Sequence, residues 1–243
     1  GFEPLVSGFV RVPFNDLAAV EKVAAVDKTI TAVLVEPIQG EAGIQVPSEG
    51  YLNGLREICD RHGWLLILDE IQSGVCRTGK WYAYQHEGVL PDILSSAKAL
   101  ANGVPIGACL ARGNAATLLT PGRHGTTFGG NPLSCRTACT VLDIMERDNI
   151  CQRAAELGTR MLAGFRQQLG GCKAVVDIRG KGLMLGIELN QNANPIKEAA
   201  LQAGVLINVT RDTIIRMLPP MILTDGQADT IVDTVSELIL SKT

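Results

Sequence analysis

The feature that most constrains the fold is a pair of apolar runs that each end on acidic residues. In TAVLVE (residues 31–36) and WLLILDE (residues 64–70), four and five consecutive apolar residues precede the acids. A helical pattern over residues 48–63 separates them, with an N-cap near Ser48 and an end at Gly63. Continuous apolar strands joined through a helix are typical of a parallel sheet covered on both faces. We therefore predict an α/β fold for this part of the chain.

The pattern then extends this sheet and changes character. NDLAAVEKVAAV (residues 15–26) predicts a helix capped by Asn15 or Asp16, and PDILSS and GACLAR predict two further short strands. Two long helical patterns occupy residues 131–170. The last part alternates short strands with helices, which is an α+β pattern. Its predicted elements are two strands over residues 174–189, a helix near 195–203, the strands GVLIN and TIIRML, and a closing helix. We place a domain boundary near residue 146.

Composition excludes several classes of function. The chain has 243 residues and a formal net charge of −3, so it lacks the basic surface that nucleic acid or an anionic membrane attracts. No run is long and apolar enough to cross a membrane. The first residues, GFEPLVSGFVRVPF, lack the basic start of a secretory signal. They also lack an initiator Met and open in mid-pattern, so we expect a fragment of a longer chain.

The cysteines point to a reducing compartment. There are seven, an odd number, and none forms a C-x-x-C motif. This favours reduced thiols in a cytosolic protein over a disulfide framework or a zinc site. Cys135 and Cys139 are spaced i, i+4 on a predicted helix, which could suit a metal. Because the chain has only three histidines, at scattered positions, we expect these two cysteines to be small buried core residues instead.

Lys98 is the only charged residue between Ile93 and Leu110. It is either an ordinary lysine whose head reaches water or the nucleophilic amine of an active site. In parallel sheets, ligands bind beyond the carboxyl ends of the strands, where Glu36 and Asp69 lie. A helix cap or a surface turn would also explain such acids. Asp69 follows five apolar residues, however, and a carboxylate there needs a cationic partner. That partner is Lys98 or a protonated ring nitrogen on a cofactor.

Two glycine-rich stretches remain. RHGTTFGGNP (residues 123–132) supplies hydroxyl and backbone N–H groups of the kind that hold a phosphate, or it is a plain turn before a helix. A lysine, an acid and phosphate donors are what pyridoxal phosphate (PLP) enzymes require. RGKGLMLG (residues 179–186) does not fit a dinucleotide-binding motif, because its glycine spacing is wrong and an apolar strand follows it. For Arg77 we expect a structural hydrogen-bonding role.

Five motifs, in order and spacing, resemble the class III (ornithine/acetylornithine-type) aminotransferases of PLP fold type I. The motifs are EPIQGEAG (36–43), LILDEIQSGVCRTG (66–79), PDILSSAKALANGVPIGA (91–108), HGTTFGGNPL (124–133) and IIRMLPPMIL (214–223). The resemblance implies a mostly parallel sheet with helices on both faces, plus a smaller α+β C-terminal domain. Residues 1–145 resemble the latter part of the large PLP-binding domain, and residues 146–243 the small domain. Cys76 stands where the family commonly has glycine.

The resemblance also implies roles around the cofactor. Lys98 resembles the Schiff-base lysine that shuttles the proton. Asp69 resembles the carboxylate that pairs with the pyridinium nitrogen. Gln72 resembles the donor to the phenolic oxygen of PLP, with Glu70 and Ile71 lining the same turn.

Further residues resemble those that contact the substrate or a neighbouring subunit. Thr127 is similar to the threonine that reaches the phosphate of the neighbouring subunit's cofactor, and Thr126 to the residue bordering that neighbour's substrate. Arg216 resembles the arginine that binds a substrate carboxylate. Glu41 resembles the acid that pairs with this arginine and is displaced, so that one site accepts both an ω-amine and an α-amino acid. No metal is implied.

The expected activity is transfer of the δ-amino group of N-acetylornithine to 2-oxoglutarate, which gives N-acetylglutamate 5-semialdehyde and glutamate in arginine biosynthesis. Ornithine, succinylornithine or 4-aminobutyrate are alternative donors within the class. The expected assembly is a cytoplasmic homodimer with active sites at the interface. The family's upstream phosphate loop and its ring-stacking aromatic residue have no counterpart in these residues. A non-catalytic, truncated PLP-fold module for binding or dimerisation is therefore the alternative from another class.

Overall fold

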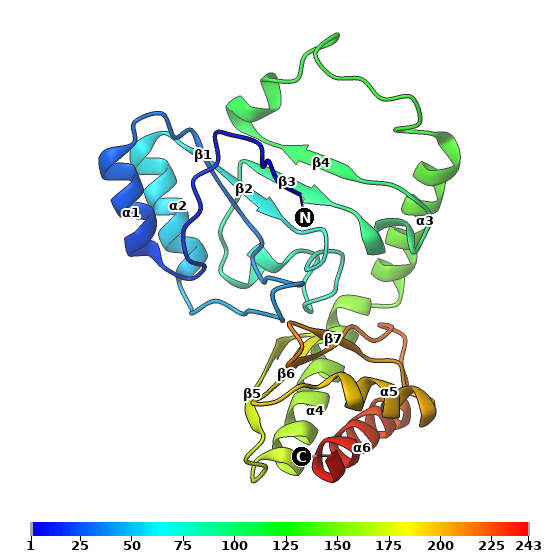
Figure 1. Ribbon diagram of the computed structural model, residues 1–243. Coiled ribbons are helices and arrows are strands. Elements are labelled where there is room, and N and C mark those ends of the chain that lie inside the picture. The colour runs from blue at the N-terminus through cyan, green and yellow to red at the C-terminus, as the bar shows by residue number, and fades with distance from the viewer. Residues whose placement is uncertain (1, 243) are drawn as a thin grey trace.

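The computed structural model describes residues 2–242, which fold around two separate sheets (Figure 1). The first sheet has the strand order β1-β2-β3-β4. β1, β2 and β3 run parallel and β4 is antiparallel to β3, so the predicted mostly parallel sheet is confirmed. The four strands are Ala32–Val35, Leu65–Asp69, Ile93–Ser96 and Ala108–Ala111.

Helices lie to both sides of this sheet. Figure 1 shows α1 and α2 beside β1 and β2, and α3 on the side of β4. Three short 3₁₀ helices connect the remaining elements. The helices are α1 (Leu17–Val26), α2 (Tyr51–His62), α3 (Pro132–Arg147), η1 (Ala83–His86), η2 (Lys98–Ala101) and η3 (Gly113–Thr117).

The ends of α1 and α2 test the caps predicted from the sequence. Of the two predicted caps of α1, Asp16 is the actual one, since its Oδ1 accepts a hydrogen bond from Ala19 N at 2.9 Å. The prediction that α2 is capped near Ser48 is wrong, because its N-cap residue is Gly50. Ser48 instead bonds Asn15 through both its backbone N–H and its hydroxyl, at 3.0 Å each, and so ties the start of α1 to that of α2. Gly63, at φ 66°, ends α2 as predicted.

Alternate apolar residues of β1 and β2 face the helices, whereas Leu34 of β1 is exposed. Leu66 and Leu68 of β2 are fully buried against Leu52, Leu55 and Ile58 of α2 and further residues of α1. Burial of a leucine-sized side chain stabilises a fold by roughly 2 kcal/mol, which explains why the apolar run holds this strand in the centre. The polar residues at the strand ends are thereby left at one edge of the sheet.

The second sheet is antiparallel, with the strand order β5-β6-β8-β7. It packs with α4 and α6 around a core that includes Leu157, Met161, Phe165, Leu185 and Ile187. The strand predicted at GVLIN is misplaced, because β7 begins only at Asn208, where pairing with β8 starts. The elements are α4 (Ile150–Leu169), β5 (Val175–Lys181), β6 (Met184–Leu189), α5 (Asn194–Gln202), β7 (Asn208–Thr210), β8 (Ile214–Met217) and α6 (Asp225–Lys242).

Asn149 separates α3 from α4, because its φ of 52° is not helical and interrupts the helical path. The residues before this break pack mainly with the first sheet and those after it with the second. The division into residues 1–145 and 146–243 stays a prediction, and we return to it below.

The prediction of reduced thiols is wrong for one pair. Cys76 and Cys151 form a disulfide, with their Cα atoms 4.4 Å apart and a separation of 75 positions along the chain. The bond joins the turn after β2 to the first turn of α4. Spacing along the sequence could not reveal it, because only the packing of that turn against α4 brings the two residues together.

The prediction that Cys135 and Cys139 are core residues is also wrong. Cys139 is exposed and Cys135 is only partly covered, because α3 buries a different face, through Ser134, Ala138 and Met145. Within residues 2–242, no cluster of three or more His, Cys, Asp or Glu side chains could hold a metal ion. No helix in this part of the chain is long and apolar enough to cross a membrane.

Candidate active site

Three charged residues gather at the carboxyl edge of the first sheet. Asp69 is the last residue of β2 and pairs in register with Ser95 of β3, three residues before Lys98. Glu36 follows the end of β1, the next strand in the sheet. Because parallel strands end at the same edge, the fold places these side chains in one region.

The backbone at Lys98 is strained. Its φ is 48°, in the left-handed region that a lysine rarely adopts and that costs about 1 to 2 kcal/mol. Lys98 opens η2, and its side chain is exposed rather than enclosed. Strain of this kind persists where surrounding structure fixes a functional side chain, so it points to Lys98 as part of a site.

Lys98 borders a cavity of about 530 Å³. Its walls come from the turn after β2, from η2, from α3 and from the segment after β8. Most of the lining residues are apolar, and Ile71 is one of them. The polar residues in the walls include Gln72, Arg77 and Asn102. A mainly apolar cavity with a few convergent polar groups is the usual form of a small-molecule site.

Gln72 is poised for a ligand. Its Oε1 is buried and has no hydrogen-bond partner within the described residues. Buried polar atoms are normally paired, so this one calls for a partner. The side chain lies against Gly40, where an added Cβ would stand 2.7 Å from Gln72 Nε2 and closer still to the other amide atoms. A side chain at position 40 would therefore force the Gln72 amide to move from this place.

The carboxylates of Asp69 and Glu70 have different hydrogen-bond partners and therefore different roles. Asp69 Oδ1 accepts from Ile71 N at 3.0 Å. Glu70 is fully buried and accepts from Ser73 Oγ at 2.7 Å and from the backbone N–H groups of Ala83 and Tyr84 at 2.9 and 2.8 Å. Burial raises the pKa of Glu70 despite these bonds. The Glu70 carboxylate therefore ties the turn to η1, and Ile71 is the one of the two predicted neighbours that lines the Lys98 cavity.

The sequence places Glu36 with Asp69 at the strand ends but assigns it no role, and the structure shows what its carboxylate does. Its Oε2 accepts from Gly40 N at 2.9 Å and so closes the turn that follows β1. Burial raises the pKa of Glu36, the Gly40 hydrogen bond opposes this, Asp69 and Glu41 add to it, and Lys98 lowers it. These four charged groups thus interact electrostatically. The position of Glu36 at a strand end was the signal in the sequence that pointed to this region.

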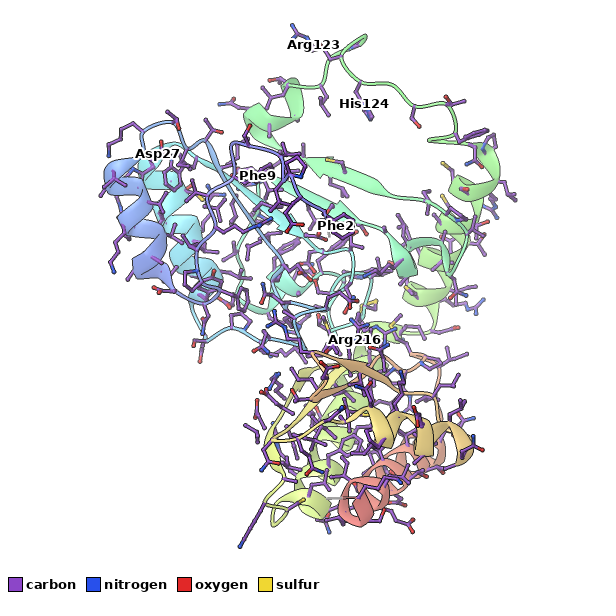
Figure 2. All side chains as sticks on the ribbon, in the orientation of Figure 1. Phe2, Phe9, Asp27, Arg123, His124 and Arg216 are labelled. Atoms are coloured by element: carbon purple, nitrogen blue, oxygen red, sulfur yellow. A yellow bond between two sulfur atoms is a disulfide. The ribbon has the colours of Figure 1, made fainter. Side chains whose placement is uncertain are left out.

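Arg216 and Glu41 form the predicted pair. Arg216 Nη1 donates to Glu41 Oε1 at 2.6 Å, and Nη2 lies 3.4 Å from Asn208 Oδ1. The Arg216 side chain is only 10% exposed, whereas that of Glu41 is 78% exposed. Arg216 Nε is buried without a partner in the part of the chain described. The arginine is held in place, then, while the glutamate is free to turn outward. Figure 2 shows Arg216 at the junction of the two sheets.

Thr126 and Thr127 do not reach the Lys98 cavity. They lie in the exposed segment between η3 and α3, where Thr126 Oγ1 accepts from Gly129 N at 3.1 Å. Figure 1 shows this segment as an arm that extends away from both sheets, and Figure 2 marks it with Arg123 and His124.

Arg77 confirms its predicted role as a structural hydrogen-bonder. It donates to Leu183 O at 3.1 Å and to Pro219 O at 2.6 Å, and so joins the turn after β2 to the second sheet and to the segment after Arg216. Burial lowers the pKa of Arg77 to about 10.

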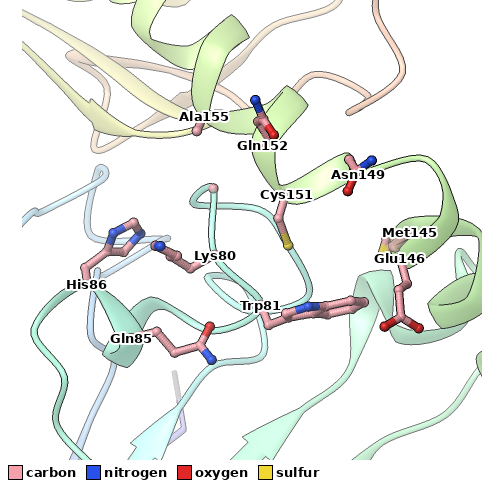
Figure 3. A pocket seen from close by; sticks show the side chains of 11 residues that line it. Lys80, Trp81, Gln85, His86, Met145, Glu146, Asn149, Cys151, Gln152 and Ala155 are labelled. Atoms are coloured by element: carbon pink, nitrogen blue, oxygen red, sulfur yellow. The ribbon is translucent and has the colours of Figure 1, made fainter.

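A second cavity, of about 740 Å³, lies on the other side of this turn, against the start of α4 (Figure 3). Trp81, His86, Glu146 and Cys151 are among its walls, and none of the predicted site residues is. Burial, the chief cause, lowers the pKa of His86. The larger cavity therefore lacks the constellation that gathers around Lys98.

Comparison with known proteins identifies the family. Residues 1–239 match the family described as Aminotransferase class-III. The acetylornithine aminotransferase of Nitrosomonas europaea is 50% identical over 239 residues, which are 98% of this chain and 61% of that protein. The chain thus spans about three fifths of the length of this curated relative.

Solved structures agree with this match. An acetylornithine aminotransferase from Elizabethkingia anophelis has a TM-score of 0.92 and 41% identity, over 96% of this chain and 60% of that one. An ornithine aminotransferase from Toxoplasma gondii, with partial occupancy of PLP at its active site, has a TM-score of 0.94 and 37% identity, over 99% of this chain and 58% of that one.

The residues present fit the cofactor of this family, PLP. A lysine at a strained position borders the cavity, a carboxylate ends the neighbouring strand, and the orphaned amide oxygen of Gln72 lies between Gly40 and the cavity wall. Sequence, fold and site lead to one assignment: the chain belongs to the class III aminotransferases.

Proposed function

We propose that the protein transfers the δ-amino group of N-acetylornithine to 2-oxoglutarate with PLP as cofactor, a step of arginine biosynthesis. The observation that carries this proposal is the placement of Lys98, Asp69 and Gln72 at one strand edge, with Arg216 of the second sheet paired to Glu41 of the turn after β1. The choice of donor is supported by the similarity to acetylornithine aminotransferases.

When bound, PLP supplies an electron sink that stabilises negative charge at the substrate carbon. Lys98 holds the cofactor through its Nζ and, once released, moves a proton at the substrate carbon as general base and then as general acid. Its strained backbone fixes the starting point of that side chain. Asp69 is the carboxylate that keeps a proton on the ring nitrogen, and its Oδ1 is held by Ile71 N. Gln72 offers its amide to the phenolic oxygen.

Arg216 and Glu41 explain how one site serves two kinds of substrate. A guanidinium binds a carboxylate through two parallel hydrogen bonds, which gives both charge and orientation. With the ω-amine donor in the site, Glu41 occupies this guanidinium. When 2-oxoglutarate enters, its carboxylate replaces Glu41, which is exposed enough to leave.

The arm with Thr126 and Thr127 supports a homodimer. These threonines do not line the cavity of their own chain, so in this proposal they serve the site of a second copy. Leu118, Leu119 and Phe128 of the same arm are exposed, which suits a surface covered by a partner. The proposal also places the protein in the cytoplasm and takes residues 1–145 and 146–243 as the two domains.

Donor specificity tests the proposal. The full-length protein is assayed with N-acetylornithine, ornithine and 4-aminobutyrate, and we expect the highest kcat/KM for N-acetylornithine. Equal or better turnover of ornithine would show that the proposed donor, N-acetylornithine, is wrong, while the proposed enzyme class would stand.

Lys98→Ala tests the chemistry, with Lys28→Ala as the matched control at a lysine that bonds only the end of α1, through Ala24 O. Wild type and Lys28→Ala should absorb between about 400 and 430 nm and lose this band on borohydride reduction. Lys98→Ala should lack it and lose turnover. A band retained in Lys98→Ala, or none in the wild type, would favour a non-catalytic module.

A further inference from the structure

A row of residues crosses the second sheet from one arginine to the other. Arg179 of β5 pairs with Gly186 of β6, and Gly186 pairs with Arg216 of β8. Residues directly opposite one another in antiparallel strands place their side chains on the same face. Arg179 and Arg216 therefore flank Gly186 on one face. Arg179 and Gly186 are the first and last residues of RGKGLMLG, the motif with no function assigned above.

The turn of residues 40–45, which carries Glu41, lies across this row. A Cβ added to Gly186 would meet Ile44 Cβ at 3.1 Å, Ile44 Cγ1 at 3.3 Å and Gly43 O at 3.5 Å. The two contacts with Ile44 are tighter than most real Cβ atoms show, whereas the one with Gly43 O is ordinary van der Waals contact, so a side chain at this position would press on Ile44 of the turn. Glycine at position 186 thus lets the turn settle onto the sheet.

Arg179 binds the backbone of this turn. Its Nε lies 2.9 Å from Ile44 O and 3.1 Å from Gly43 O, and its Nη2 donates to Gly43 O at 2.7 Å. Its Nη1 bonds Glu188 at 2.6 Å and Asp177 at 3.0 Å. Five planar donors make arginine suited to such a set of acceptors. The side chain is only 13% exposed, so these bonds are largely shielded from water.

The remainder of the turn is fixed as well. Ile44 is fully buried against Ile38, Met184 and Leu218 and has a φ of 52°. The backbone on one side of Glu41 is thereby immobilised, whereas the Glu41 side chain itself is exposed and bonded to Arg216. The turn is fastened to the sheet by one arginine and presents a carboxylate to the other.

We propose that Arg179 is a positioning residue that sets substrate selectivity: it holds the turn so that Glu41 competes with a substrate carboxylate for Arg216. This inference rests on the proposed function. Without the anchor, the turn spends less time in the position that pairs Glu41 with Arg216, and Arg216 becomes more available to a dicarboxylate. Selectivity then shifts toward 2-oxoglutarate and away from the ω-amine donor.

The test compares Arg179→Gln with Glu41→Gln, with the double variant and with Arg160→Gln in the full-length protein. Arg160 pairs with Asp229 of α6, away from the turn, and is the matched control. We expect Arg179→Gln to raise the ratio of kcat/KM for 2-oxoglutarate to that for N-acetylornithine about fivefold, mainly through a lower KM for 2-oxoglutarate. Glu41→Gln should act in the same direction. In the Glu41→Gln background, Arg179→Gln should add less than about twofold.

Two readouts do not need turnover. Hydrogen exchange of the peptide covering residues 39–46 should quicken in Arg179→Gln and stay at the wild-type rate in Arg160→Gln. Glutarate, a dicarboxylate probe, should bind about fivefold more tightly to Arg179→Gln by calorimetry. If Arg179→Gln does not fold, Gly186→Ala presses on the same turn and should change the same readouts in the same direction.

The outcomes separate the inference from the proposed function. Equal loss of kcat/KM for both substrates, or an undiminished Arg179→Gln effect when Glu41 is already glutamine, would overturn the inference and leave the enzyme class intact. A wild-type protein without transaminase activity would refute the proposed function. Glutarate binding and hydrogen exchange would then test by themselves whether Arg179 holds the turn. Unchanged exchange and unchanged glutarate affinity in both Arg179→Gln and Gly186→Ala would overturn the inference.

Discussion

Replacing Gly158 by alanine should destabilise the protein, although alanine is the better helix former. Gly158 lies in the middle of α4, where its Cα passes the turn between β5 and β6. An added Cβ would stand 2.7 Å from Gly182 Cα and even nearer to the carbonyl carbon and oxygen of the same residue. All three are backbone atoms, so no side-chain rotation can relieve the contact.

The size of the effect follows from two opposing contributions. Alanine is favoured over glycine inside a helix by about 1 kcal/mol. Forcing a methyl group into a packed contact costs typically 1 to 3 kcal/mol, and a backbone neighbour places this case near the upper end, about 3 kcal/mol. The net loss is then about 2 kcal/mol. For a chain of this size each kcal/mol lowers Tm by about 2 to 4 °C, so we expect a decrease of about 4 to 8 °C.

The assay is thermal unfolding followed by circular dichroism, with Gly226→Ala as the matched control. Gly226 lies in the first turn of α6, where a Cβ would meet nothing within 4 Å. This variant gains helix propensity without a clash and should unfold at or slightly above the wild-type temperature. A Tm for Gly158→Ala equal to or above that of the wild type would refute the packing argument.

Two further predictions concern the turn after β2. Removing the Cys76–Cys151 bond, by Cys151→Ser or by a dithiol reductant, should cost up to about 4.5 kcal/mol on the chain-entropy estimate for a separation of 75 positions; a Tm unchanged by reductant would contradict the bond. Burial raises the pKa of Glu70 above its ordinary 4.5, so the folded state keeps this proton to higher pH than the unfolded state, and the contribution to stability is lost as pH rises through the folded pKa. Between about pH 4 and pH 7, the Tm of wild type relative to Glu70→Gln should therefore fall, and a constant difference would show that Glu70 does not titrate in this range.

The first sheet and its strand-end acids could be predicted because their signal is local. A strand buried on both faces must be apolar throughout, and the next residue beyond the sheet is free to be polar. β2 and Asp69 follow from this rule, whereas β1 is apolar although its Leu34 is exposed. Glu36 and Lys98 lie shortly beyond the ends of β1 and β3. The motif that contains Gln72 adds the family's expectation, which stays a prediction; the Oε1, unpaired among the described residues, shows only that this side chain has a free acceptor at the site.

The contacts that cross between distant segments could not be predicted. Cys76 and Cys151 meet because a turn packs on a helix start, which no spacing encodes. Asn208 lies beside Arg216 through the register of β7 with β8, and a shift of one residue would place it on the other face. The same holds for the row from Arg179 to Arg216, since sequence patterns reveal that strands exist but not which of their residues are opposite one another.

The contacts between the two sheets set the distance between Lys98 and Arg216, which neither sheet sets alone. Lys98 lies in η2, just beyond β3 of the first sheet, and Arg216 lies in β8 of the second. A substrate whose amine reaches Lys98 and whose carboxylate reaches Arg216 would therefore span the junction between the two sheets. Arg77 and Gly182 hold that junction, the first by donating to Leu183 O and Pro219 O. Gly182 holds the junction because it has no side chain and so leaves space for the backbone of residues 77–79. If Arg216 takes a carboxylate as proposed, variants at this junction should change the preferred length of the substrate before they abolish catalysis, because the distance changes while Lys98 and Asp69 keep their places at the first sheet.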